Sequence, residues 1–106
     1  MNIQDFEYNA GRATTLLTMM ANKQRLMLLC RLVEGEASVN ALAASLGLRQ
    51  STVSQHLAKL RESDIVAGRR DGQTIYYSLA GVEARAVLET LYGLYCDPQT
   101  AASSLQ

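Results

Sequence analysis

The most constraining feature of this sequence is an apolar pattern, interrupted by one glycine, between residues 39 and 60. Ser38 is a good N-cap for a short helix from Val39 to Leu46, and Gly47 supplies the positive φ that ends a helix in a tight turn. A second helix, about Gln50 to Glu62, follows at once. Its apolar stripe, with spacings of four and three, consists of Val53, Leu57 and Leu60. Two short helices joined in this way have the spacing of a helix-turn-helix.

The opposite face of the second helix is polar without being strongly charged. With the apolar stripe turned inward, helical geometry directs small hydroxyls, an amide and a lysine outward. Such side chains read base edges and hold phosphates in a DNA major groove. His56 lies on the flank of the stripe, where a phosphate contact and a packing role are both open. The predicted DNA contacts of this helix are Arg49, Gln50, Ser51, Thr52, Ser54, Gln55, His56 and Lys59.

A hairpin is predicted directly behind this helix. The β-prone runs 65–70 and 74–78 flank Asp71-Gly72, and an Asp-Gly pair between such runs is a strong hairpin signal. A hairpin behind a recognition helix is typical of a wing, whose tip reaches the DNA backbone or the minor groove. The alternative is a surface hairpin with solvated arginines. The predicted DNA contacts of the wing are Arg69, Arg70 and Gln73.

Composition and charge place the chain among folded domains and leave room for a nucleic-acid partner. The 106 residues are 48% apolar and carry no net charge, but residues 49–70 hold five basic groups against two acidic ones. No apolar run approaches the roughly 18 residues of a membrane span, and no secretory leader pattern opens the chain. Two cysteines suit cytosolic thiols better than a disulfide framework. We expect a cytoplasmic protein with one domain over residues 1–98 and a flexible tail over 99–106.

Three further helices complete the expected fold. Amphipathic stripes predict a first helix over about Gln4–Met20 and a last helix over about Val82–Cys96. Between the first helix and the helix-turn-helix, an apolar run after Asn22 predicts a buried helix, with Asn22 as its N-cap. The expected architecture is therefore mostly α, with about five helices and a β-hairpin wing.

Together these residues resemble the ArsR/SmtB family of winged-helix transcriptional repressors. The similarity covers about Asp5 to Pro98 and is highly specific over residues 48–79. The resemblance implies a homodimer built from the first and last helices, a double-stranded operator as partner, and release by an inducer. The two amphipathic stripes fit those roles, because each would otherwise leave apolar surface exposed on a small domain.

The resemblance also narrows the choice of inducer. Metal-sensing members carry a cysteine pair in the third helix or Asp, His and Glu ligands in the last. This chain has no cysteine in the third helix and no histidine in the last. A tetrahedral metal site needs three or four N or S ligands, which two cysteines and His56 do not supply. We therefore expect neither a metal nor a cofactor, although a metal-responsive or general redox repressor stays an alternative.

Two cysteines carry the remaining chemistry. Cys30 lies near the end of the second helix and Cys96 closes the last. By themselves they are best interpreted as unrelated thiols, one a small core residue and the other a surface residue. One branch of the resembled family, the BigR-, SqrR- and HlyU-like regulators, pairs cysteines at these two places. That similarity implies a redox-sensing dithiol that reacts with sulfide-derived persulfides, through a polysulfide or disulfide bridge, and a persulfide-type small molecule as inducer.

Two other classes of function are alternatives to a DNA-binding repressor. A winged helix can serve as a protein-interaction module without reading DNA, but the outward polar face and the basic hairpin argue against it. An enzyme is not expected, because the sequence offers no carboxylate pair, no nucleophile–histidine pair and no phosphate-binding loop.

Overall fold

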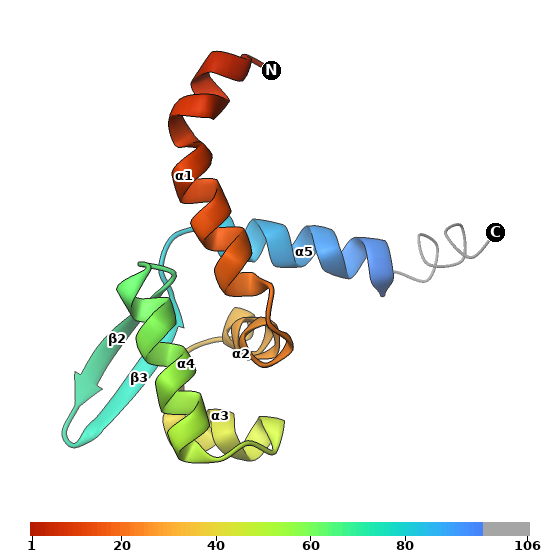
Figure 1. Ribbon diagram of the computed structural model, residues 1–106. Helices are drawn as coiled ribbons and strands as arrows, with labels where there is room; N and C mark the ends of the chain where they lie inside the picture. Colours follow the sequence, from red (N-terminus) through yellow and green to blue (C-terminus); the bar gives the residue numbers. More distant parts are fainter. Residues whose placement is uncertain (97–106) are drawn as a thin grey trace.

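The computed structural model describes residues 1–96, so the predicted tail at 99–106 lies outside the described residues. Over that range the chain forms a winged helix-turn-helix with five helices, as expected (Figure 1). The elements in order are α1 (Ile3–Met20), α2 (Lys23–Val33), β1 (Ala37–Ser38), α3 (Val39–Leu46), α4 (Gln50–Glu62), β2 (Val66–Asp71), β3 (Thr74–Leu79) and α5 (Glu83–Tyr95).

Local capping explains both ends of α3. The Oγ atom of Ser38 accepts a hydrogen bond from the amide of Ala41 at 3.1 Å, and this N-cap starts α3. Gly47 ends α3 with φ at 65°, a left-handed conformation that glycine adopts without the strain of a β-carbon. The predicted bounds of α3 and α4, residues 39–46 and 50–62, are confirmed.

The wing is the hairpin of β2 and β3, and a short third strand extends the sheet. β3 lies at the centre, between β1 and β2, and both pairings are antiparallel. Asp71 still pairs with Thr74, so the loop is Gly72–Gln73, one residue later than the predicted Asp71-Gly72 tip. Gly72 has φ at 64°, and a positive φ at the first position of a two-residue loop is typical of a type II′ turn. β1 was not expected, because a strand of two residues has no alternation to detect.

The core lies between α2, α3, α4 and the base of the sheet. Its fully buried side chains are Leu28, Leu29, Leu32, Leu42, Val53, Leu57 and Leu60. The last three are the predicted stripe of α4, which is therefore confirmed. Because the stripe anchors α4 to the core, the opposite face of α4 is held outward.

α1 and α5 extend from the winged body in different directions (Figure 1). Their apolar stripes are only partly covered: Met20 is the buried residue of α1, and Ala84 and Leu88 are those of α5. The large apolar side chains that stay exposed on these two helices are Ile3, Phe6, Tyr8, Leu17, Tyr92, Leu94 and Tyr95. Within the described residues, no helix has the length and apolar character needed to cross a bilayer.

Candidate DNA-binding face and thiol pair

The outward face of α4 presents the predicted polar side chains to solvent. Among the predicted contacts, Thr52 and His56 are half-buried at the edge of this face. The exposed ones are Arg49, Gln50, Ser51, Ser54, Gln55 and Lys59. Within residues 1–96 no ion pair engages Arg49 or Lys59. Arg49 is also the N-cap of α4, with no side-chain hydrogen bond to the first amides of the helix. Free cations and free amide groups at a helix start are favourable for binding phosphate.

His56 turns toward α2 rather than away from the body of the protein. Its Nε2 atom is hydrogen bonded to Oε1 of Gln24 at 2.8 Å, and its Nδ1 atom is buried without a partner. Burial lowers the pKa of His56, and the charges of Arg25 and Lys59 lower it further. The imidazole is therefore held in its neutral form and ties the recognition helix to α2. A contact between His56 and DNA stays a prediction.

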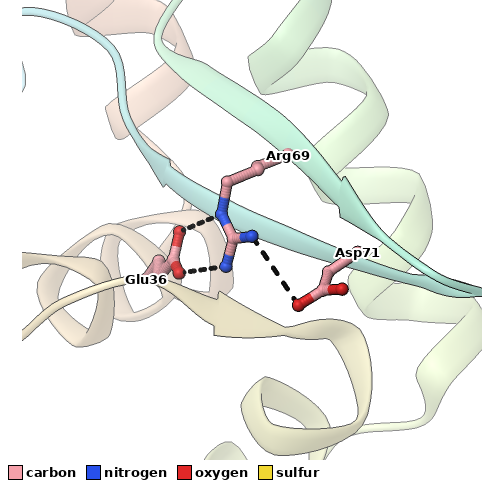
Figure 2. A network of polar contacts seen from close by, with 3 residues as sticks. All are labelled: Glu36, Arg69 and Asp71. Carbon is pink, nitrogen blue, oxygen red and sulfur yellow. Dashed lines mark hydrogen bonds and ion pairs between the residues drawn. The ribbon is translucent and has the colours of Figure 1, made fainter.

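The wing arginines differ in their surroundings. Arg70 is exposed and takes part in no ion pair within the described chain. Figure 2 shows that the guanidinium of Arg69 is instead held by Glu36, from Nε to Oε2 at 3.2 Å and from Nη2 to Oε1. A weaker ion pair joins Nη1 of Arg69 to Asp71 at 3.9 Å. Gln73 lies exposed in the loop.

Glu36 is a residue that reasoning from the sequence missed. Its hydrogen bond with Arg69 lowers the pKa of its carboxyl group, so the carboxylate stays charged. The two residues are 33 positions apart, and no local pattern links an acidic loop residue to a hairpin arginine. The pairing of both β1 and β2 with the central strand β3 brings them together.

The two cysteines lie on packed neighbours, α2 and α5. Both are free thiols; Cys30 is half-buried against the core and Cys96 is exposed at the C-cap of α5. Burial raises the pKa of Cys30, and the charge of the Cys96 thiolate raises it further. The two sulfurs are therefore near enough to interact electrostatically. No cluster of three or more His, Cys, Asp or Glu side chains suited to a metal ion occurs in residues 1–96.

Comparison with known proteins accords with this geometry. Residues 22–67 match the family model described as "Bacterial regulatory protein, arsR family". The transcriptional activator HlyU of Vibrio cholerae is 46% identical over 96 residues, covering 91% of this chain and 89% of the relative. The crystal structure of the transcriptional repressor BigR from Xylella fastidiosa is similar with a TM-score of 0.84 and 42% identity, covering 91% of this chain and 98% of that one.

A third similarity concerns a solution structure from Mycobacterium bovis, described as a homodimeric winged helix-turn-helix DNA-binding domain. It has a TM-score of 0.75 and 27% identity, covering 83% of this chain and 82% of that one. The high identity to HlyU and BigR extends over nearly the whole length of each chain. The chain therefore belongs to the ArsR family, and it is a DNA-binding transcriptional regulator rather than an enzyme.

Proposed function

We propose that this protein is a homodimeric repressor that binds a double-stranded operator and releases it when Cys30 and Cys96 react with a persulfide. The observation that carries the DNA-binding half is the exposed, unpaired polar face of α4 beside the wing. The proposed contacts are Arg49, Gln50, Ser51, Thr52, Ser54, Gln55 and Lys59 on α4, with Arg70 and Gln73 on the wing. His56 and Arg69, which already have protein partners, are the marginal members of the set.

A dimer is supported by the apolar surface that one copy leaves uncovered. Phe6 on α1 is 56% exposed, and Tyr95 on α5 is 76% exposed, which is unfavourable in water unless a partner covers them. The Mycobacterium bovis relative is described as homodimeric. A two-fold dimer would present two α4 helices to half-sites about 34–36 Å apart, so the operator would be pseudo-palindromic.

The sign of regulation is the finer part of this proposal. HlyU is named an activator and BigR a repressor. We favour repression because a dimer that dissociates from its operator when an inducer reacts with it needs no further contact with the transcription machinery. A DNA partner also supports the proposal that the protein acts in the cytoplasm.

The thiol switch would proceed by sulfur transfer. The exposed thiolate of Cys96 attacks the outer sulfur of a donor RSSH, the thiol RSH leaves, and a protein persulfide forms. The Cys30 thiolate then attacks the inner sulfur of that persulfide, HS⁻ leaves, and a disulfide joins the two cysteines. When both cysteines carry persulfides, a further RSSH is reduced to RSH and H₂S, and a tetrasulfide bridge closes. The packing of α2 against α5, the helices that carry the two cysteines, supports a bridge between them.

Either bridge would tie α2, in the core of the winged domain, to the end of α5 on the exposed flank. If α5 forms the dimer interface, the bridge would alter the relative placement of the two α4 helices. A small change in their separation is enough to weaken binding to half-sites of fixed spacing.

The thiol switch is tested by the intact mass of reduced protein after anaerobic treatment with a persulfide donor, with hydrogen peroxide in parallel. A gain of two sulfurs and loss of two hydrogens with the donor only, linking Cys30 to Cys96, supports a persulfide sensor. Loss of two hydrogens with both reagents identifies a general redox switch instead. The variant Cys30→Ser/Cys96→Ser should bind DNA and ignore the donor; if it still releases DNA, the switch lies elsewhere.

The DNA-binding face is tested by the salt dependence of binding to a duplex that the protein itself selects from a random-sequence pool. Lys59→Gln should reduce the slope of log affinity against log salt by about 0.9 for each protomer. Arg31→Gln is the matched control, because it removes one positive charge from α2, outside the proposed DNA contacts. If the affinity for the duplex does not depend on salt, the winged helix is better interpreted as a protein-interaction module.

A further inference from the structure

We propose that Glu36 and Arg69 form a clamp that positions the wing, and that Arg70 alone provides the positive charge of the wing to the DNA backbone. The inference rests on the proposed contact between wing and DNA. It assigns different tasks to two adjacent arginines that look equivalent in the sequence.

The clamp spans the whole width of the sheet. Arg69 on β2 pairs with Tyr76 on β3, and Tyr76 in turn pairs with Ser38 on β1. The guanidinium of Arg69 lies over the Tyr76 ring, 5.0 Å from its centroid. It also reaches Glu36, just before β1 (Figure 2). The outer strand of the wing is thereby joined to the segment that leads into α3. A wing held in this way keeps a defined position relative to the helix-turn-helix.

The charge of Arg69 is already matched. Two of its nitrogens contact the Glu36 carboxylate, and the third faces Asp71. A planar guanidinium bound two-pronged to a carboxylate has the strongest geometry available to it. A DNA phosphate would have to displace Glu36 to make the same contact. The lowered pKa of Glu36 means that this carboxylate stays charged, so the competition persists at neutral pH.

Arg70 lies on the other face of the hairpin, since neighbouring residues in a strand point to opposite sides. It pairs with Ile75 and shares its side of β2 with the buried Val66, which packs into the core. β2 packs against α4, so this is the face of the wing nearer the recognition helix. Arg70 therefore combines a position beside α4 with a charge that no ion pair within residues 1–96 engages.

The test uses four variants. They are Glu36→Gln, Arg69→Met, the double variant that combines these two changes, and Arg70→Met alone. Arg69→Met keeps the apolar stem over Tyr76 but removes the charge. All three substituted positions are exposed, so thermal unfolding should confirm that each of the four variants is folded. The first readout is amide hydrogen exchange of β2 in the free protein. The second is affinity for the selected duplex as a function of salt.

The clamp predicts that Glu36→Gln and Arg69→Met each speed amide exchange in β2 without DNA. Each should weaken binding by about threefold, as expected for an exposed ion pair of good geometry, and leave the salt slope unchanged. The double variant should be no weaker than either single one, because both remove the same interaction. Arg70→Met should lower the salt slope by about 0.9 for each wing.

Opposite results overturn the assignment. If Arg69 contacts phosphate and Glu36 merely competes, Glu36→Gln will strengthen binding, and Arg69→Met will lower the salt slope as Arg70→Met does. Unchanged exchange in β2, or additive losses in the double variant, would equally refute the clamp. If Arg70→Met changes neither affinity nor slope, the proposed wing contact itself fails. Amide exchange measured in the free protein would still show whether Glu36 and Arg69 hold the wing in position.

Discussion

Replacing Cys96 by serine should make Cys30 more reactive toward an alkylating agent at alkaline pH, although no atom of Cys30 changes. The thiolate is the reacting form of cysteine, and the negative charge of Cys96 raises the pKa of the Cys30 thiol. Removing that charge lowers the pKa again, so a larger fraction of Cys30 is ionised at a given pH. The effect exists only if the two thiols are close enough for the charge of one to act on the other.

The raised pKa sets a bound on the size of the effect. A thiol at the ordinary value of 9.0 is about 1% ionised at pH 7 and half ionised at pH 9. Cys30 lies above that value, mainly because it is partly buried. Its rate of alkylation at pH 7 should therefore be below about a hundredth of its alkaline plateau. Cys96 is exposed and should react first at every pH.

The assay is a short pulse of limiting iodoacetamide on the reduced protein over a range of pH, with peptide mass spectrometry to score each cysteine. In the Cys96→Ser variant the midpoint of the Cys30 profile should move to lower pH. Cys96→Asp is the matched control, because it keeps a negative charge at the same place and should leave the midpoint high.

Three results would refute this reasoning. A Cys30 midpoint at or below pH 9.0 would contradict the raised pKa. An identical midpoint in wild type and Cys96→Ser would mean that the sulfurs do not interact, and a direct bridge between them would lose its main support. Equal shifts for the serine and aspartate variants would assign the change to access rather than to charge.

Three further predictions concern stability and assembly. Leu57→Ala should lower the free energy of unfolding by about 2–5 kcal/mol in urea titration, since Leu57 is 0% exposed; exposed Ser54→Ala should change it by less than about 0.5 kcal/mol, and similar losses in both would contradict the burial pattern. The pKa of His56 is lowered from 6.5, so the unfolded chain binds a proton more readily than the folded one, and the free energy of unfolding should fall as the pH falls below about 6.5. His56→Gln should flatten this decrease. An unaltered dependence of the urea midpoint on pH in that variant would reject His56 as the cause. Tyr92→Glu should shift the protein to monomers in sedimentation velocity, whereas the nearby Glu89→Gln should stay dimeric; a persistent Tyr92→Glu dimer would place the interface elsewhere.

The elements that could be predicted from sequence are those whose determinants lie within a few residues. α3 begins and ends where Ser38 and Gly47 predict, because a side-chain cap and a left-handed glycine act on their immediate neighbours. The buried and exposed faces of α4 follow from helical period alone. The loop of the wing lies one residue later than predicted, because Asp71 still pairs with Thr74 and so extends the strand. That pairing depends on the partner strand as well as on the turn residues.

The roles of single side chains needed the folded chain. His56 is ambiguous on the flank of an apolar stripe, and its bond to Gln24 on α2 resolves its packing role. β1 and the contact between Glu36 and Arg69 depend on residues brought together across the sheet, which no local pattern encodes. Helix starts, helix faces and the hairpin are thus determined by the sequence through short-range sterics and hydrogen bonding. Tertiary structure alone decides which wing arginine takes part in an ion pair and whether the two thiols can influence each other. Both depend on distances between segments far apart in the chain.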